Sequence, residues 1–71
     1  PDRELRILRE VLEDCDGELS QSAAEWADLF DRKTSGINTV LRRLCDRAGF
    51  SLTRDGELSE WVVRTRAQNF G

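Results

Sequence analysis

One amphipathic stretch, residues 34–49, constrains the fold of this chain more than any other. Apolar residues recur along it at helical spacing, namely Ile37, Val40, Leu41, Leu44, Cys45 and Ala48. Thr34 or Ser35 is expected to cap the N-terminus, and Gly49 stands where a left-handed C-terminal cap is expected. We therefore predict one helix here, with a polar face made of Asn38, Thr39, Arg42, Arg43, Asp46 and Arg47.

Two further helices are predicted before this stretch. The first covers residues 2–14, because its apolar residues form a stripe at helical period: Leu5, Leu8, Val11, Leu12 and Cys15. The second begins at Ser22, which forms a capping box with Glu25, or two residues earlier at Ser20, and ends near Phe30 or Asp31. Between the two helices, Leu19 is isolated among polar residues, as is typical of a short extended segment.

After Gly49 the apolar residues alternate, which favours strands over residues 50–53 and 58–64. A turn is expected at residues 54–57, because Asp55-Gly56 is a strong hairpin signal. A competing interpretation has Ser59 capping a last helix within residues 58–68. The strand is favoured because residues 61–65 are rich in β-branched and aromatic side chains.

Chain length limits the protein to one domain, since 71 residues leave no room for a second core. The predicted fold class is α+β, with a folded core over about residues 3–64 and a tail over residues 65–71. The chain begins with Pro1 and not with an initiator Met, so we expect it to be a domain of a larger protein. No signal peptide or transmembrane stretch is visible, and an intracellular location is expected, in the cytoplasm, nucleoid or nucleus.

Catalysis and metal binding find little support in the composition. The chain has no His and no Tyr, and its two cysteines lie thirty residues apart. Cys15 and Cys45 both fall on apolar stripes, so they are predicted to be buried thiols rather than metal ligands or disulfide partners. We expect neither enzymatic activity nor a cofactor.

The net charge of −3 hides a strong segregation along the chain. Residues 1–31 contain ten acidic and three basic side chains, whereas residues 32–54 contain six basic and one acidic side chain. The basic block coincides with the central helix and the segments beside it. Such a pattern is typical of a protein with one basic face and an acidic back.

The predicted order of elements resembles a winged helix-turn-helix domain over about residues 5–64. Ala27 matches the small residue of the first helix of this motif, and Ile37 and Val40 match the aliphatic pair ten and thirteen residues later. Two positions depart from the pattern, because Asp31 replaces a usual Gly and Arg32 replaces a usual apolar residue. Asp tolerates left-handed backbone geometry, whereas Arg32 suggests a different or longer turn.

The resemblance implies that the central helix enters the major groove of double-stranded DNA and that the hairpin is a wing. Ser35, Gly36, Asn38, Thr39 and Arg42 lie where base edges would be read. Phosphate contacts are expected from the remaining basic residues, with Arg54 placed at the hairpin tip. The full candidate set is Arg32, Lys33, Thr34, Ser35, Asn38, Thr39, Arg42, Arg43, Arg47 and Arg54.

Two functions remain open from the sequence. The first is DNA binding, by a transcription regulator or by an accessory domain of a replication, partition or recombination protein, with parent domains or a homodimer adding affinity. The second is a protein-interaction module that docks a basic partner through exposed acids at the first helix, namely Glu4, Glu10, Glu13, Asp14 and Asp16.

Simpler interpretations exist for single residues of the candidate set. Each arginine of the central helix could belong to an ordinary solvated face, and such faces are common. Trp26 and Trp61 are expected to be core residues rather than platforms for stacking on bases. The combination of helix spacing, hairpin and basic block favours DNA binding over these separate interpretations.

Overall fold

The computed structural model describes residues 2–65 of the chain. Its elements are α1 (Asp2–Asp14), β1 (Glu18–Gln21), α2 (Ala23–Leu29), the 3-10 turn η1 (Thr34–Gly36), α3 (Ile37–Ala48), β2 (Ser51–Asp55) and β3 (Glu60–Arg64). Within these residues the protein is α+β, with three α-helices and one three-stranded antiparallel sheet. The tail predicted over residues 65–71 lies, apart from Thr65, outside the described residues.

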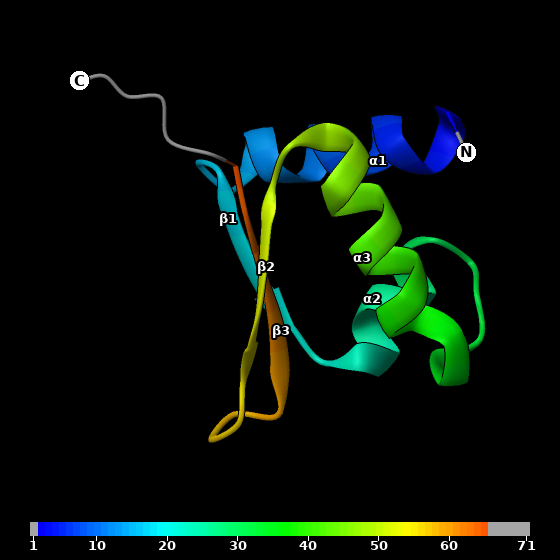
Figure 1. Cartoon of the computed structure of the whole chain (residues 1–71), viewed down its shortest axis with the longest axis vertical. Coiled ribbons are helices and arrows are strands. Elements are labelled where there is room, and N and C mark those ends of the chain that lie inside the picture. Colours follow the sequence, from blue (N-terminus) through cyan, green and yellow to red (C-terminus); the bar gives the residue numbers. More distant parts are fainter. Residues whose placement is uncertain (1, 66–71) are drawn as a thin grey trace.

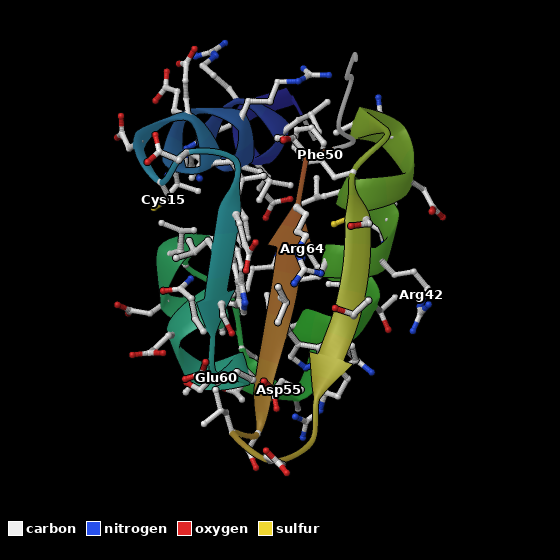
Figure 2. All side chains as sticks on the ribbon, turned by 90° about the vertical axis from the view of Figure 1, so that its left-hand side faces the viewer. Cys15, Arg42, Phe50, Asp55, Glu60 and Arg64 are labelled. Carbon is white, nitrogen blue, oxygen red and sulfur yellow. The ribbon has the colours of Figure 1, made fainter. Side chains whose placement is uncertain are left out.

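The sheet has β3 in its centre, between β1 and β2. All three helices cover one face of this sheet, with α1 at one end of the molecule and the β2–β3 hairpin reaching the other end (Figure 1). The opposite face bears strand side chains such as Glu60 and Arg64 (Figure 2). This arrangement is compatible with the winged-helix-like layout that the resemblance implies.

The core lies between the helices and the covered face of the sheet. Leu19, Val63 and Leu52 stand opposite one another on the three strands and pack toward the helices. The largest fully buried side chain is that of Trp26 in α2. Its ring stacks on Phe30 with the ring centroids 6.2 Å apart, and its Nε1 donates a hydrogen bond of 2.9 Å to the carbonyl oxygen of Trp61 in β3. Trp26 therefore joins the helices to the sheet.

The two cysteines differ in their surroundings. Cys45 is buried in α3, as predicted, and packs in the apolar core. Cys15 follows the last residue of α1 and is half-buried, so the prediction that it is fully buried on a helix is wrong. It sits in the turn that closes the helix, where Gly17 donates a backbone hydrogen bond of 2.7 Å to Leu12.

Most of the predicted helix ends are confirmed. Ser22 Oγ accepts from the amide of Glu25, and the Glu25 carboxylate accepts from the amide of Ser22, completing the capping box. Gly49 ends α3 with φ 76°, in the left-handed conformation that glycine adopts most easily.

The predicted start of the third helix is wrong. The α-helix begins at Ile37 rather than near Thr34, and residues 34–36 form the separate turn η1. Neither Thr34 nor Ser35 caps α3, because Gly36 occupies the N-cap position. As glycine has no side chain, this helix start has no side-chain cap. The extra turn agrees with the longer connection that Arg32 suggested.

The hairpin is confirmed as two strands, but its turn lies later than predicted. Asp55 still pairs with Glu60, so the loop consists of residues 56–59. Asp55 Oδ1 accepts hydrogen bonds of 3.1 Å from the amides of Glu57 and Leu58, and this Asx-type turn places the loop beyond the expected residues 54–57. Ser59, and not Asp55 or Gly56, takes the left-handed conformation, with φ 56°.

Removing the Ser22 hydroxyl tests the contribution of the capping box to stability. We expect Ser22→Ala to lower the free energy of unfolding by about 1 kcal/mol, because the start of α2 loses its cap. Urea denaturation followed by circular dichroism measures the change. Ser35→Ala is the matched control, since no cap depends on its side chain, and it should change stability by less than about 0.5 kcal/mol.

Candidate nucleic-acid interface

Helix α3 has one buried face and one exposed face. Ile37, Val40, Leu41, Leu44 and Cys45 are buried against the core, as the periodicity predicts. The exposed face carries Asn38, Thr39, Arg42, Arg43, Asp46 and Arg47. Five of the candidate residues therefore share one solvent-facing surface of a rigid helix, and Arg42 projects away from the sheet on the β2 side (Figure 2).

The segment that leads into α3 is also exposed. Lys33, Thr34, Ser35 and Gly36 all face solvent, and a hollow of about 380 Å³ lies beside them. Asp31, Arg32, Lys33, Ser35, Gly36 and Val40 line this hollow. In Figure 1, η1 and the start of α3 lie at the same end of the molecule as the hairpin tip. The structure thus brings the candidate loop, the N-terminal end of α3 and the hairpin to one end.

A left-handed turn at Asp31 sets the path of this segment. Asp31 has φ 57°, as expected for a residue that replaces glycine at the end of α2. The amide of Arg32 then donates a hydrogen bond of 2.8 Å to the carbonyl oxygen of Ala27, and that of Asp31 donates to Asp28. These two bonds satisfy carbonyls of the last turn of α2 and direct the chain toward α3.

Arg32 is bound within the fold. Its guanidinium makes a bidentate ion pair with the buried carboxylate of Glu4 in α1, with Nη2 donating to Oε1 at 3.0 Å. The hydrogen bond from Arg32 lowers the pKa of Glu4, against the opposing effect of burial, and the same contact raises the pKa of Arg32. Arg32 therefore fastens the turn to α1, whereas Lys33 beside it faces solvent.

Arg54 does not lie at the hairpin tip, so its predicted position is wrong. It is a residue of β2 that pairs with Trp61, and the Asx-type turn places the loop farther along the chain. Its guanidinium carbon lies 5.4 Å from the centroid of the Trp61 ring. Because residues two apart on a strand share a face, Arg54 lies on the same sheet face as Leu52, which packs toward the helices.

The hairpin tip itself is acidic and apolar. Glu57 and Leu58 are exposed there, Leu58 to 63%, and Asp55 and Glu60 form the last pair of the strands. A tip of this charge does not favour contact with phosphates. Any contribution of the hairpin to a nucleic-acid surface comes from Arg54 and not from the loop.

Sequence reasoning misses two partners of the candidate residues. The expectation that Glu4 is an exposed acid of the first helix is wrong, because its carboxylate is buried against Arg32. Its position at helical spacing from Leu8 is a signal of burial in the sequence itself. The expectation that Trp61 is a core residue holds only in part, because it is half-buried and stacks with Arg54. That pairing depends on the strand register.

Two kinds of feature, a metal-binding group and a membrane-spanning helix, are not found among the described residues. Residues 2–65 contain no group of three or more His, Cys, Asp or Glu side chains arranged to hold a metal ion. None of the helices in this part of the chain has the length and apolar composition to cross a membrane. Comparison of the chain with models of known protein families, with curated proteins and with solved structures finds no match.

The Glu4–Arg32 pair predicts a pH-dependent contribution to stability. Because the pKa of Glu4 is lowered in the fold, the stabilisation is present above the ordinary value of 4.5 and is lost as the pH falls through the lower, folded value. Glu4→Gln should therefore lower the unfolding temperature at pH 7. The difference from the wild type should shrink steadily below pH 4.5.

Glu10→Gln is the control for this measurement, because Glu10 is exposed on the same helix and forms none of the ion pairs found in residues 2–65. Thermal unfolding between pH 3 and pH 7 compares the three proteins. The Glu4–Arg32 assignment would be contradicted if both variants lowered the unfolding temperature equally at pH 7. It would also be contradicted if the difference in unfolding temperature between Glu4→Gln and the wild type did not change with pH.

Burial also predicts the reactivity of Cys45. Loss of hydration raises the pKa of this thiol to about 11, and the neighbouring Asp46 charge adds to the effect. We expect iodoacetamide at pH 8 to leave Cys45 unmodified in the folded protein and to alkylate it fully in urea. Peptide mapping by mass spectrometry measures both. Rapid modification of Cys45 under native conditions would show that the helix packing opens readily.

Proposed function

We propose that this protein binds double-stranded DNA as a winged-helix domain, with α3 in the major groove and the β2–β3 hairpin as the wing. Three observations support the proposal: the element order, the sheet order β1-β3-β2 and the exposed polar face of α3. An α-helix has the width to enter the major groove, and its N-terminal residues meet the base edges first.

The observation that carries the proposal is the cationic face of α3. Arg42, Arg43 and Arg47 are all exposed, and none of them takes part in the two ion pairs found among the described residues. Asp46 is the one acidic residue of the helix. Three guanidinium groups on a helix that the core holds in place can neutralise phosphates without refolding.

The exposed residues divide by position into two groups. Ser35, Asn38, Thr39 and Arg42 lie toward the N-terminal end and are proposed to meet base edges, Asn38 pairing with adenine and Arg42 with guanine. Asn38 Oδ1 accepts a hydrogen bond of 2.9 Å from the Thr39 amide, which orients the side-chain amide before DNA arrives. Lys33, Thr34, Arg43 and Arg47 are proposed to contact the backbone and fix the register.

The wing contributes through its strand. Arg54 lies on the sheet face that the helices cover, and its stacking on Trp61 limits its rotamers. Arg54 Nη1 also donates a hydrogen bond of 3.1 Å to the carbonyl oxygen of Asp55. A preordered guanidinium loses less conformational entropy when it meets a phosphate. Arg32 is assigned to the fold instead, since a phosphate would have to displace the Glu4 carboxylate.

Docking of a basic protein through α1 is the less favoured function. Glu10, Glu13, Asp14 and Asp16 are exposed, as that alternative requires. However, Glu4 is already neutralised by Arg32, and the arginines Arg6 and Arg9 lie on the same helix as the acids. The surface of α1 therefore carries both signs of charge, whereas that of α3 is mainly basic.

The proposed biological setting is based on the small number of exposed basic side chains that could contact DNA. Lys33, Arg42, Arg43, Arg47 and Arg54 would give four or five phosphate or base contacts. Such a domain fits a transcription regulator that binds through more than one domain, or an accessory domain of a replication, partition or recombination protein. The logarithm of its affinity should fall with the logarithm of the salt concentration with a slope of about −4.

Substitution of two arginines of α3 tests the proposal. Arg42→Ala/Arg43→Ala should weaken binding to a fluorescent duplex by at least about tenfold at 150 mM salt, because two charge contacts are lost. The salt slope should become shallower by about 1, because Arg43 is the phosphate contact of the two and Arg42 reads a base. Fluorescence anisotropy over a salt series measures both quantities.

Arg3→Ala/Arg64→Ala is the control, since it removes the same formal charge from α1 and β3, where Arg64 pairs with Glu18, and it should leave the affinity within about threefold. Amide shifts on adding DNA at low salt should concentrate on residues 33–47 and Arg54. Shifts confined to residues 1–19, or equal losses in the two double variants, would overturn the proposal.

A further inference from the structure

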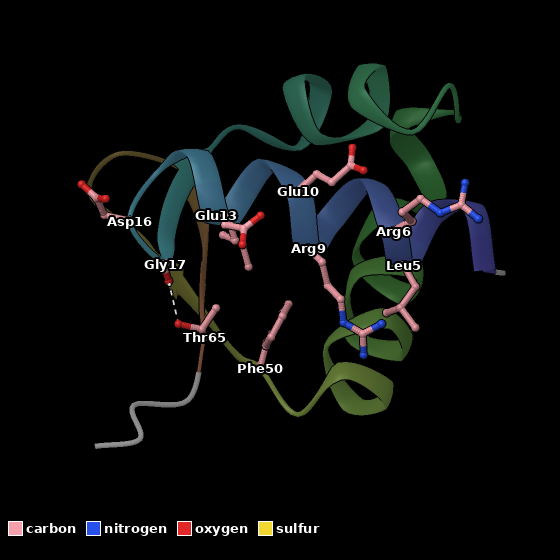
Figure 3. A pocket seen from close by; sticks show the side chains of 10 residues that line it. Leu5, Arg6, Arg9, Glu10, Glu13, Asp16, Gly17, Phe50 and Thr65 are labelled. Carbon is pink, nitrogen blue, oxygen red and sulfur yellow. Dashed lines mark hydrogen bonds between the residues drawn. The ribbon is translucent and has the colours of Figure 1, made fainter. Parts of the chain in front are cut away.

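A hollow lies beside α1, at the end of the molecule away from the hairpin tip. It measures about 830 Å³, and Figure 3 shows the side chains that line it. Its apolar lining comes from Leu5, Leu12 and Phe50, with Gly17 and Thr65 closing one end. The remaining lining residues are charged side chains of α1 and of the turn after it: Arg6, Arg9, Glu10, Glu13 and Asp16.

These charges are ordered along the helix. Arg6 and Arg9 come first along the helix, and Glu10, Glu13 and Asp16 follow them in its last turns and in the turn beyond. Glu4 does not interrupt this order, because its carboxylate is buried against Arg32. The surface of α1 beside the hollow thus changes from positive to negative along its length.

This order of charges does not serve the isolated helix. The last turn of α1 contains Glu13 and Asp14 and no basic residue, which places negative charge at the negative end of the helix dipole. Arg precedes Glu in the pairs Arg6/Glu10 and Arg9/Glu13, which is the weaker of the two orders at this spacing. Neither of the ion pairs found between residues 2 and 65 includes any of these side chains.

We propose that α1 is the contact surface between two copies of this chain, paired antiparallel about a two-fold axis. A two-fold axis sets the two arginines of one helix against the acids that follow them in the other, so that Arg6 and Arg9 face Asp16 and Glu13 of the second copy. An interface of this kind must be self-complementary, and a reversal of charge along one helix satisfies that condition. Among the apolar lining residues, Phe50 is half-buried and supplies surface for the contact, whereas Leu5 and Leu12 are already buried in the core.

A second copy fits this surface better than a basic or an acidic partner. A uniformly basic partner would meet Arg6 and Arg9, and a uniformly acidic one would meet Glu10, Glu13 and Asp16. In the antiparallel dimer each of the two arginines faces an acidic residue of the second copy. No partner of a different sequence is needed. The helix dipoles of the two copies also oppose each other in this arrangement.

The proposed dimer is independent of the proposed DNA contact. None of the residues that line the hollow belongs to α3, although Phe50 follows it closely, and the hairpin tip lies at the opposite end of the molecule (Figure 1). One dimer would therefore carry two copies of α3, which doubles the number of available cations. This would compensate for the small basic charge of a single copy.

Single charge reversals provide the first part of the test. Arg9→Glu places two acids opposite each other in the dimer, and Glu13→Arg places two bases opposite each other. Each variant should weaken self-association at least about tenfold, as measured by sedimentation equilibrium up to millimolar concentration. Circular dichroism confirms that each variant is folded. Glu57→Arg on the hairpin tip is the control and should associate like the wild type.

An equimolar mixture of Arg9→Glu and Glu13→Arg provides the second and decisive part of the test. In the mixed dimer the acid introduced at position 9 of one variant meets the base introduced at position 13 of the other. The native Arg9 likewise meets the native Glu13, so association should return to within about threefold of the wild type. Native mass spectrometry identifies the mixed species by its mass.

A pairing within one helix could not produce this recovery, so the mixture separates the proposed contact from a local effect on α1. A wild-type chain that stays monomeric at millimolar concentration, or variants that fail to associate on mixing, would overturn the proposal. Either outcome is independent of what the protein does with DNA, because the measurement contains none.

Discussion

The position of α3 depends on the left-handed turn at Asp31. At this residue the chain leaves α2, and the hydrogen bond from Arg32 to Ala27 closes the helix end. The side chain of Arg32 then reaches Glu4. Arg32 therefore hydrogen-bonds a carbonyl of α2 through its backbone amide and binds α1 through its guanidinium. Glycine would make the turn easily, but an apolar residue at position 32 would lose the contact with α1. At the position where the resemblance predicts an apolar residue, Arg32 thus joins the end of α2 to α1.

Local sequence patterns predict the elements that are stabilised locally. The apolar spacing of α1 and α3, the Ser22–Glu25 capping box and Gly49 as a C-cap each depend on residues within a few positions, and each is confirmed. The start of α3 differs from the prediction because Thr34 and Ser35 resemble caps, whereas the chain forms an additional 3-10 turn after Asp31. The hairpin loop differs because the Asp55 carboxylate, and not Gly56, organises it.

Contacts between distant residues cannot be read from local pattern. Glu4 and Arg32 are 28 positions apart, and Trp26 reaches the carbonyl of Trp61 across 35 positions. The hollow beside α1 likewise needs Leu5, Phe50 and Thr65 in one place. Of the candidate binding residues, those on α3 are placed correctly by the sequence because helical period alone exposes them. The ion pair of Arg32 and the position of Arg54 within β2 are missed because they depend on tertiary contacts and strand register.

The exposed residues of α3 have no evident task in the fold. Its buried positions are all apolar or thiol side chains, and its exposed positions make no ion pair with the rest of the described chain. A surface that only needed to be soluble could use acidic residues, as the N-terminal part of this acidic protein does. Concentrating arginine on one helix raises the repulsion between like charges. Since the fold gains nothing from that repulsion, the arrangement supports the proposal that α3 faces a polyanionic partner, which would remove it.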